Sequence, residues 1–133
     1  MLRRVSLALA FAALSAAPAL AQHDHHAAPS SGSAAPLLEG LGSAHREIKT
    51  NAPLAQKYFD QGLRLAYGFN HEEAKRAFLE AARLDSTCAM AWWGAALVLG
   101  PNINLPMSPE AETEAYRYAQ RALACKGAPP LDR

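Results

Sequence analysis

A histidine cluster near the N-terminus holds the residues best suited to metal chemistry. His23, His25 and His26 surround Asp24 in "QHDHH". Neutral imidazoles grouped in this way can bind Cu(II), Ni(II) or Zn(II). No neighbouring group is visible that would orient the rings, so a polar low-complexity tail is the alternative interpretation.

A second group of chemically capable side chains lies between residues 68 and 102 and includes His71, Cys88 and Met90. His71 and Cys88 are separated by a helix of roughly 14 residues, or about 20 Å of helical rise, and therefore cannot share one metal. The sequence lacks the C-x-x-C and H-x-x-x-H spacings of zinc sites. It also lacks hydrolase motifs and a phosphate-binding glycine loop. We therefore expect neither an enzyme nor a bound cofactor.

Composition and charge limit the class of partner. The chain has 133 residues, is 50% hydrophobic and carries a formal net charge of +1. These values are typical of one small globular unit and give no basic footprint for a nucleic acid.

The first 21 residues have the organisation of a secretory signal peptide. Arg3 and Arg4 precede an uncharged apolar run, and Ala-Leu-Ala ends at Ala21. An uncleaved anchor is the alternative, but the run is shorter than the ~20 residues needed to span a bilayer. We expect a mature chain that begins at Gln22, is periplasmic or secreted, and has no stable membrane insertion.

The remaining chain divides by composition into four segments. Residues 22–36 are rich in Ala, Ser, Gly and Pro and predict a flexible leader. Residues 37–53 are a lead-in segment, residues 54–127 carry helical patterns, and residues 128–133 form a tail. The helical region must position any site.

Two amphipathic helices are predicted at the start of the helical region. The first fits Pro53 to Tyr67, with Gly68 as its stop. The second fits Glu72 to Leu84, with Asn70 as its cap and Glu73 able to complete a capping box. Its apolar positions recur at helical spacing and are Ala74, Ala77, Phe78, Ala81 and Leu84. The short link forces an antiparallel pair.

A third helix is expected within the uncharged run from Cys88 to Leu99, which is apolar on all sides. A helix of this kind is enclosed by neighbours. The residues expected to form core or inter-repeat contacts are Met90, Trp92, Trp93 and Val98. A fourth helix begins at Ser108 as cap, followed by Pro109 and Glu110 in its first turn.

The order of large and small residues resembles the tetratricopeptide repeat, a helix-turn-helix unit of about 34 residues. The matching positions of the first repeat are Tyr58, Gly62, Ala74, Phe78 and Ala81, and Ser86 stands where the repeat usually has a proline. The second continues with Trp92, Ala96, Ala115, Ala119, Ala122 and Gly127, if its two helices are joined by seven extra residues. The resemblance implies an all-α fold in which antiparallel helix pairs stack as a short solenoid of about two repeats.

The run from Ala55 to Met107 is also similar to a group of exported bacterial repeat proteins that are generally longer. The resemblance implies that the chain is an N-terminal portion or a truncated relative. A last helix without a third repeat would leave an apolar stripe uncovered. The isolated chain would then be marginally stable or self-associate through this stripe, which a longer natural form or a partner would cover. The stripe is Ala111, Ala115, Tyr118, Ala119 and Ala122.

The loops that join paired helices lie at one end of such a solenoid. Asn70 and His71 should therefore approach the long loop "GPNINLPMSP", which holds Asn102, Asn104 and Met107. These five residues are the candidate partner-binding site. The alternative is that both loop asparagines only satisfy backbone groups of a turn.

Cys88 opens the first helix of the second repeat and Cys125 closes its antiparallel partner, so the two residues should meet, and an oxidising compartment permits a disulfide. Two buried thiols are the alternative. For function we expect an exported scaffold that binds a peptide or protein partner. A periplasmic metal handler that uses the histidine leader, with His45 or Met107, is the second hypothesis.

Overall fold

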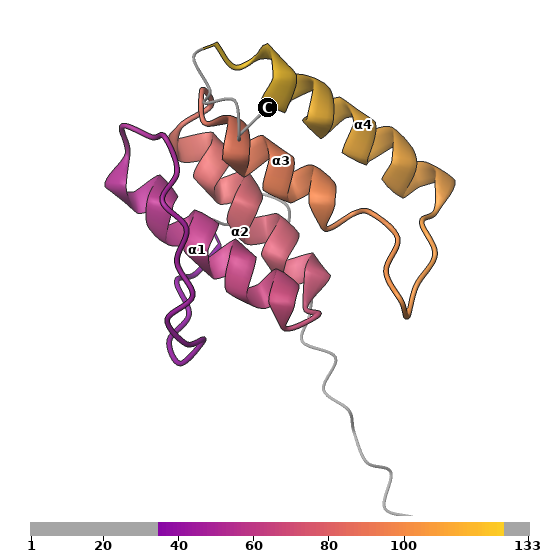
Figure 1. Cartoon of the computed structure of the whole chain (residues 1–133), viewed down its shortest axis with the longest axis horizontal. Helices are drawn as coiled ribbons and strands as arrows, with labels where there is room; N and C mark the ends of the chain where they lie inside the picture. Colours follow the sequence, from indigo (N-terminus) through magenta and orange to yellow (C-terminus); the bar gives the residue numbers. More distant parts are fainter. Residues whose placement is uncertain (1–34, 127–133) are drawn as a thin grey trace, which may run out of the picture. The chain divides into compact units, whose positions relative to one another are not determined.

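The computed structural model describes residues 35–126, and these residues contain four helices and no strand. They are α1 (Pro53–Tyr67), α2 (His71–Leu84), α3 (Ala89–Leu97) and α4 (Pro109–Ala124). Helix α2 packs against α1 and α3, and α4 packs against α3, as Figure 1 shows. The predicted all-α fold of stacked antiparallel helix pairs, a short solenoid of helical hairpins, is confirmed.

Local capping explains where the helices begin. The Asn70 side chain accepts a hydrogen bond from the Glu73 amide (3.4 Å), and the Ser108 side chain accepts one from the Ala111 amide (3.2 Å). Both caps were predicted from the sequence, because a side-chain oxygen before the first turn satisfies a free amide. The Glu73 carboxylate binds Arg76 at 2.9 Å, so the expected capping box is replaced by an ion pair.

The turn between α1 and α2 places an unusual residue in the left-handed region. Phe69 has φ 59°, whereas Gly68 has an ordinary φ of −81°. The Asn70 amide donates to the Leu65 carbonyl at 2.9 Å and the Phe69 amide to the Ala66 carbonyl at 3.1 Å, which satisfies the last carbonyls of α1. Gly68 follows the last helical residue as predicted, but the strained position belongs to a phenylalanine.

A single ring joins three helices in the core. Phe78 of α2 is fully buried and lies 5.4 Å from the Phe59 ring of α1. An ideal Cβ on Gly62 or Gly94 would come within 2.8 Å or 2.5 Å of the Phe78 ring. Both glycines therefore allow a close helix approach. The sequence predicted Gly62 and placed the equivalent position of α3 at Ala96, whereas the residue that contacts Phe78 is Gly94.

The apolar helix α3 is less enclosed than expected. Met90 and Val98 are buried, and Trp92 is half-buried and stacks on Tyr118 of α4 at 5.9 Å between ring centroids. Trp93 is 40% exposed, so it does not belong to the buried core.

The stripe of α4 that was expected to be uncovered faces inward. Ala115, Tyr118 and Ala122 are buried, and Ala111 and Ala119 are half-buried, because α4 lies on α3 through this face. The stripe is therefore not the uncovered face that was expected, and self-association of the chain stays a prediction. The large apolar side chains that α4 exposes are Tyr116 and Leu123, and they stand among charged and polar neighbours.

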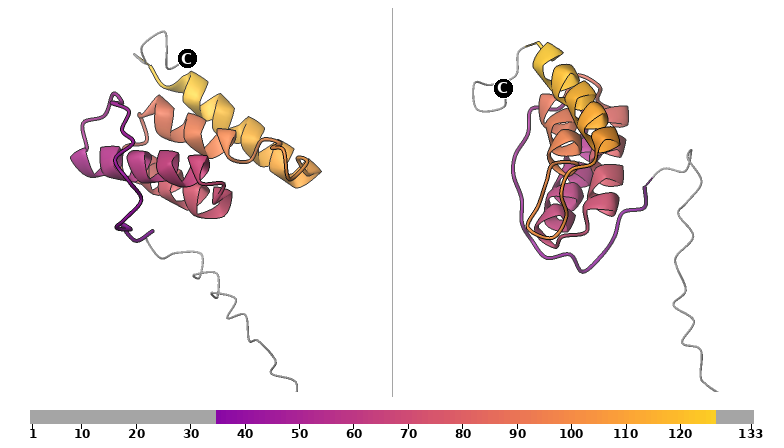
Figure 2. Two further views of the ribbon diagram at one scale, coloured as in Figure 1. Left: turned by 60° about the horizontal axis from the view of Figure 1, so that its bottom comes forward. Right: turned by 90° about the vertical axis from the view of Figure 1, so that its right-hand side faces the viewer.

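The segment before α1 is not helical, and we call residues 35–52 the strap. Figure 1 and the left view of Figure 2 show it against α1, on the opposite side of the helix bundle from α4. Gly40 and Gly42 have φ values of 77° and 84° and allow the strap to turn. Ala35, the first described residue of the strap, is buried, and its carbonyl accepts a hydrogen bond from the Tyr58 hydroxyl at 2.6 Å.

The predicted signal peptide, cleavage site, residues 22–34 of the leader and C-terminal tail lie outside the described residues. His23, His25 and His26 lie there as well.

Candidate functional site

The two hairpin loops meet at one end of the solenoid, as the sequence predicted (Figure 1). His71 begins α2, and Asn102 belongs to the loop that joins α3 to α4. The Asn102 amide nitrogen lies 3.2 Å from Nδ1 of His71. The amide can donate to that ring nitrogen only when the nitrogen is unprotonated.

Asn102 also builds its own loop. Its side-chain oxygen accepts hydrogen bonds from the amides of Asn104 (2.9 Å) and Leu105 (3.1 Å). Asn102 and Leu105 pair through their backbone at 3.0 and 3.2 Å. Asn102 therefore satisfies backbone groups of its own turn, as the alternative interpretation of the loop asparagines predicted. The residue at the tip of this turn, Ile103, projects into solvent with 90% of its surface exposed.

A hollow of about 310 Å³ lies between the two loops. Four of the five residues predicted for the site line it, and they are Asn70, His71, Asn102 and Asn104. Met107 is half-buried and lies outside this lining. The remaining lining residues are Phe69, Glu72 and Leu105.

Apolar side chains around this hollow are the feature that sequence reasoning missed. Phe69, Ile103 and Leu105 are 63%, 90% and 65% exposed, and we call these three residues the loop-end patch. The Phe69 ring stacks on His71 at 6.1 Å between centroids. The available signal was the presence of apolar residues in turns, where polar residues are usual. Exposed apolar groups gathered at one place are typical of an interaction surface.

The site has few groups for acid–base or metal chemistry. Within residues 35–126, no three His, Cys, Asp or Glu side chains are grouped to hold a metal ion. His45, one proposed metal ligand, donates through Nδ1 to the Asp60 carboxylate at 2.7 Å. The arrangement at the loop end provides hydrogen bonds and apolar contact, which suits binding.

A second hollow, of about 480 Å³, is lined by residues of the α2–α3 connection and of the end of α4. Its lining includes Trp92, Arg121 and Cys125, with the Arg121 guanidinium 4.6 Å from the centre of the Trp92 ring. The Cys125 thiol lies 3.8 Å from the Ser86 carbonyl, across the junction between the two segments.

Cys88 and Cys125 are free thiols in this structure. Burial raises the pKa of both, and the nearby Asp85 carboxylate adds to the effect at each. Cys125 also contributes to the raised pKa of Cys88, which places the two thiols in each other's electrostatic field. The disulfide between them stays a prediction for the oxidising compartment.

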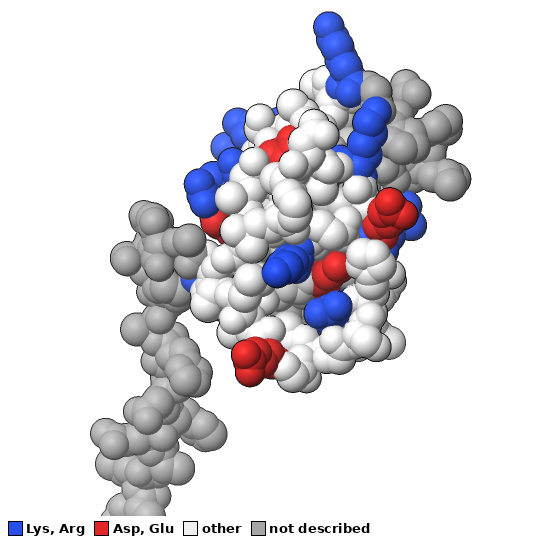
Figure 3. Space-filling model, turned by 90° about the vertical axis from the view of Figure 1, so that its left-hand side faces the viewer, with Lys and Arg blue, Asp and Glu red and all other residues white. Residues whose placement is uncertain are grey.

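The face shown in Figure 3 gives no strong preference for a partner of one charge, because Lys and Arg lie among Asp and Glu and much of the surface is uncharged. Among residues 35–126, no helix has the length and apolar character to cross a bilayer. Comparison of the chain with protein-family models, with curated proteins and with solved structures found no match.

Proposed function

We propose that this protein is an exported scaffold of the tetratricopeptide type that binds a protein or peptide partner through the loop-end patch. The observation that carries the proposal is the contact between loops of two different hairpins, Asn102 to His71, beside three exposed apolar side chains. A surface assembled from two repeat units is a common recognition mode of solenoids.

The backbone at Phe69 supports this assignment. A bulky residue in the left-handed region costs of order 1–3 kcal/mol, and its side chain is exposed, so burial gives little in return. Glycine or asparagine would fit this position at less cost. Strained backbone positions cluster at functional sites, which favours a binding role for this exposed ring.

The first test compares two matched double variants of the mature chain. Ile103→Ser with Leu105→Ser removes apolar surface at the loop end. Tyr116→Ser with Leu123→Ser removes side chains of similar exposure, 67% and 60%, from the outer face of α4. All four positions project from the molecule, so both variants should keep the wild-type helical circular dichroism.

We expect proteins captured from periplasmic extract to bind the loop-end variant about tenfold more weakly or worse, because hot-spot positions cost more than about 1.4 kcal/mol. The α4 variant and a chain without residues 22–34 should capture the same proteins as wild type. Equal capture by all chains, judged by quantitative mass spectrometry, would refute the proposal. Asn102 is left unchanged because its side chain holds the turn.

A further inference from the structure

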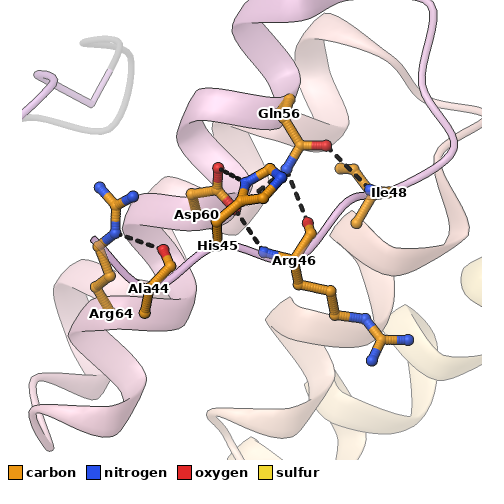
Figure 4. Close-up of polar contacts among 7 residues, drawn as sticks. All are labelled: Ala44, His45, Arg46, Ile48, Gln56, Asp60 and Arg64. Atoms are coloured by element: carbon orange, nitrogen blue, oxygen red, sulfur yellow. Dashed lines mark hydrogen bonds and ion pairs between the residues drawn. The ribbon is translucent and has the colours of Figure 1, made fainter. Parts of the chain in front are cut away.

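One face of α1 carries a row of polar side chains that bind the strap through hydrogen bonds. Gln56, Asp60 and Arg64 are spaced four residues apart, so they fall on one side of the helix. Figure 4 shows all three turned toward the strap, at residues 44–48. We call these three residues the polar row.

The polar row forms hydrogen bonds with the backbone of the strap. The Arg64 guanidinium donates to the Ala44 carbonyl at 2.7 Å, and the Asp60 carboxylate accepts from the Arg46 amide at 3.2 Å. The Gln56 amide group donates to the Arg46 carbonyl at 2.9 Å and accepts from the Ile48 amide at 3.0 Å. The strap thus runs antiparallel to α1, with its backbone groups paired one after another. Main-chain pairing of this kind binds an extended peptide with little dependence on its sequence.

Two side chains of the strap add to this pairing. Ile48 is buried, and His45 donates to Asp60 at 2.7 Å. The neighbouring residues 44 and 47 are exposed. Recognition therefore uses an extended backbone, one apolar side chain and one hydrogen-bond donor three residues before it.

The polar row needs an occupant. Asp60 is buried and accepts three hydrogen bonds, two from the strap and one from Gln56 at 3.1 Å. Without the strap, Asp60 would lose both of those partners, and Gln56 would keep only its hydrogen bond to Asp60. Removal of an occupant from such groups is costly unless another one replaces it.

We propose that the polar row of α1 is a receptor for an extended peptide segment, which the strap occupies within the same chain. A partner protein with an extended segment that places an apolar residue in the position of Ile48 would displace the strap. Because the strap is tethered, its effective concentration is on the order of millimolar, so a competitor binds tightly only when the strap is weakened. The receptor uses residues distinct from the loop-end patch, so neither proposal depends on the other.

The test uses a synthetic peptide with the sequence of residues 43–50, "SAHREIKT", added to the mature protein. Binding is followed by the NMR shift of the Gln56 side-chain amide. In the strap variant, His45→Ala with Ile48→Ser, the receptor is intact but its occupant is weakened. We expect this variant to bind the peptide at least tenfold more tightly than wild type does.

Two controls identify the mode of binding. A peptide N-methylated at the isoleucine amide lacks the donor to Gln56 and should lose at least tenfold in affinity. Gln56→Ala in the strap variant should cause a similar loss of affinity. Because this variant lacks the Gln56 amide, its binding is measured from the NMR shift of the Arg64 side chain. Equal binding to wild type and strap variant, or tight binding of the methylated peptide, would overturn the proposal.

Hydrogen exchange in the wild-type chain gives a check that needs no variant. The Arg46 and Ile48 amides should exchange at least tenfold faster than core amides of α2, because the strap opens without unfolding the helices. Exchange at the α2 rate would show that the strap is a permanent part of the core and overturn the proposal. Dimerisation through an exchanged strap would identify a second copy as the occupant and would also overturn it.

Discussion

Asp85 joins three parts of the chain through one carboxylate. One oxygen accepts from the Thr50 hydroxyl at 2.6 Å and from the Asn51 amide at 3.2 Å, both in the strap. The other accepts from the Thr87 hydroxyl at 2.6 Å and the Thr87 amide at 3.0 Å. The hydrogen bond from Thr50, followed by that from Thr87, lowers the pKa of Asp85 because the charged form is favoured.

The lowered pKa of Asp85 predicts a loss of stability in acid. The stabilisation is fully present above the unfolded pKa of about 3.9 and disappears as pH falls through the lower folded pKa. Asp85→Asn should therefore reduce the free energy of unfolding near pH 7 by about 1–3 kcal/mol and weaken its decline in acid. Urea unfolding from pH 3 to pH 7 measures both, with exposed Glu112→Gln as the charge control. Parallel profiles for wild type and Asp85→Asn would contradict this role.

Helix contacts set the outcome of a glycine substitution in α3. Glycine to alanine within a helix normally stabilises by about 1 kcal/mol, because alanine has the higher helix propensity. At Gly94, the added Cβ would lie 2.5 Å from the buried Phe78 ring. We expect Gly94→Ala to destabilise by about 1–3 kcal/mol instead, since overpacking outweighs propensity.

Urea unfolding of Gly94→Ala, Phe78→Leu and the double variant checks this prediction. The smaller leucine should relieve the clash, so the double variant should be more stable than the sum of the two single effects predicts. A stabilised Gly94→Ala would show that α2 and α3 separate easily at this point.

Periodicity and capping residues made the individual helices predictable. The bounds of α1, the caps Asn70 and Ser108 and the fold class follow from local spacing, which the sequence displays directly. Gly94 was missed because its role depends on where α3 crosses Phe78, which helix spacing alone does not determine. The strap was missed as a docked segment because an extended chain bound through its backbone has no periodic side-chain pattern.

For the candidate site, topology predicted that His71 and Asn102 would meet, because loops of stacked hairpins share one end. The loop-end patch was not predicted, since the exposure of Phe69 and Ile103 depends on turn geometry. The stripe on α4 was correctly recognised as apolar, but it covers α3. The number of repeats does not determine which face of α4 is open. The apolar face of α4 packs first against its own hairpin partner, α3.

The Cys88–Cys125 disulfide would fasten the start of α3 to the end of α4. Closing a loop of about 38 residues should raise the free energy of unfolding by about 4 kcal/mol, because the unfolded chain loses entropy. Protein purified from the periplasm, unfolded without reductant, should therefore show no reactive thiol, and Cys125→Ser should show one. Two reactive thiols in the wild-type chain would contradict the bond. The raised pKa of each thiol keeps its thiolate scarce near neutral pH, so uncatalysed oxidation in air should be slow.

Because the strap binds α1 through its backbone, its sequence should diverge among orthologues in a particular way. Ala44 contributes a carbonyl and Glu47 an exposed side chain, so most substitutions at these two positions leave the contacts with α1 intact. Orthologues should therefore drift rapidly at positions 44 and 47 while keeping Gln56, Asp60 and an apolar residue at position 48. Proline should be absent at positions 46 and 48, because it removes an amide that the polar row binds.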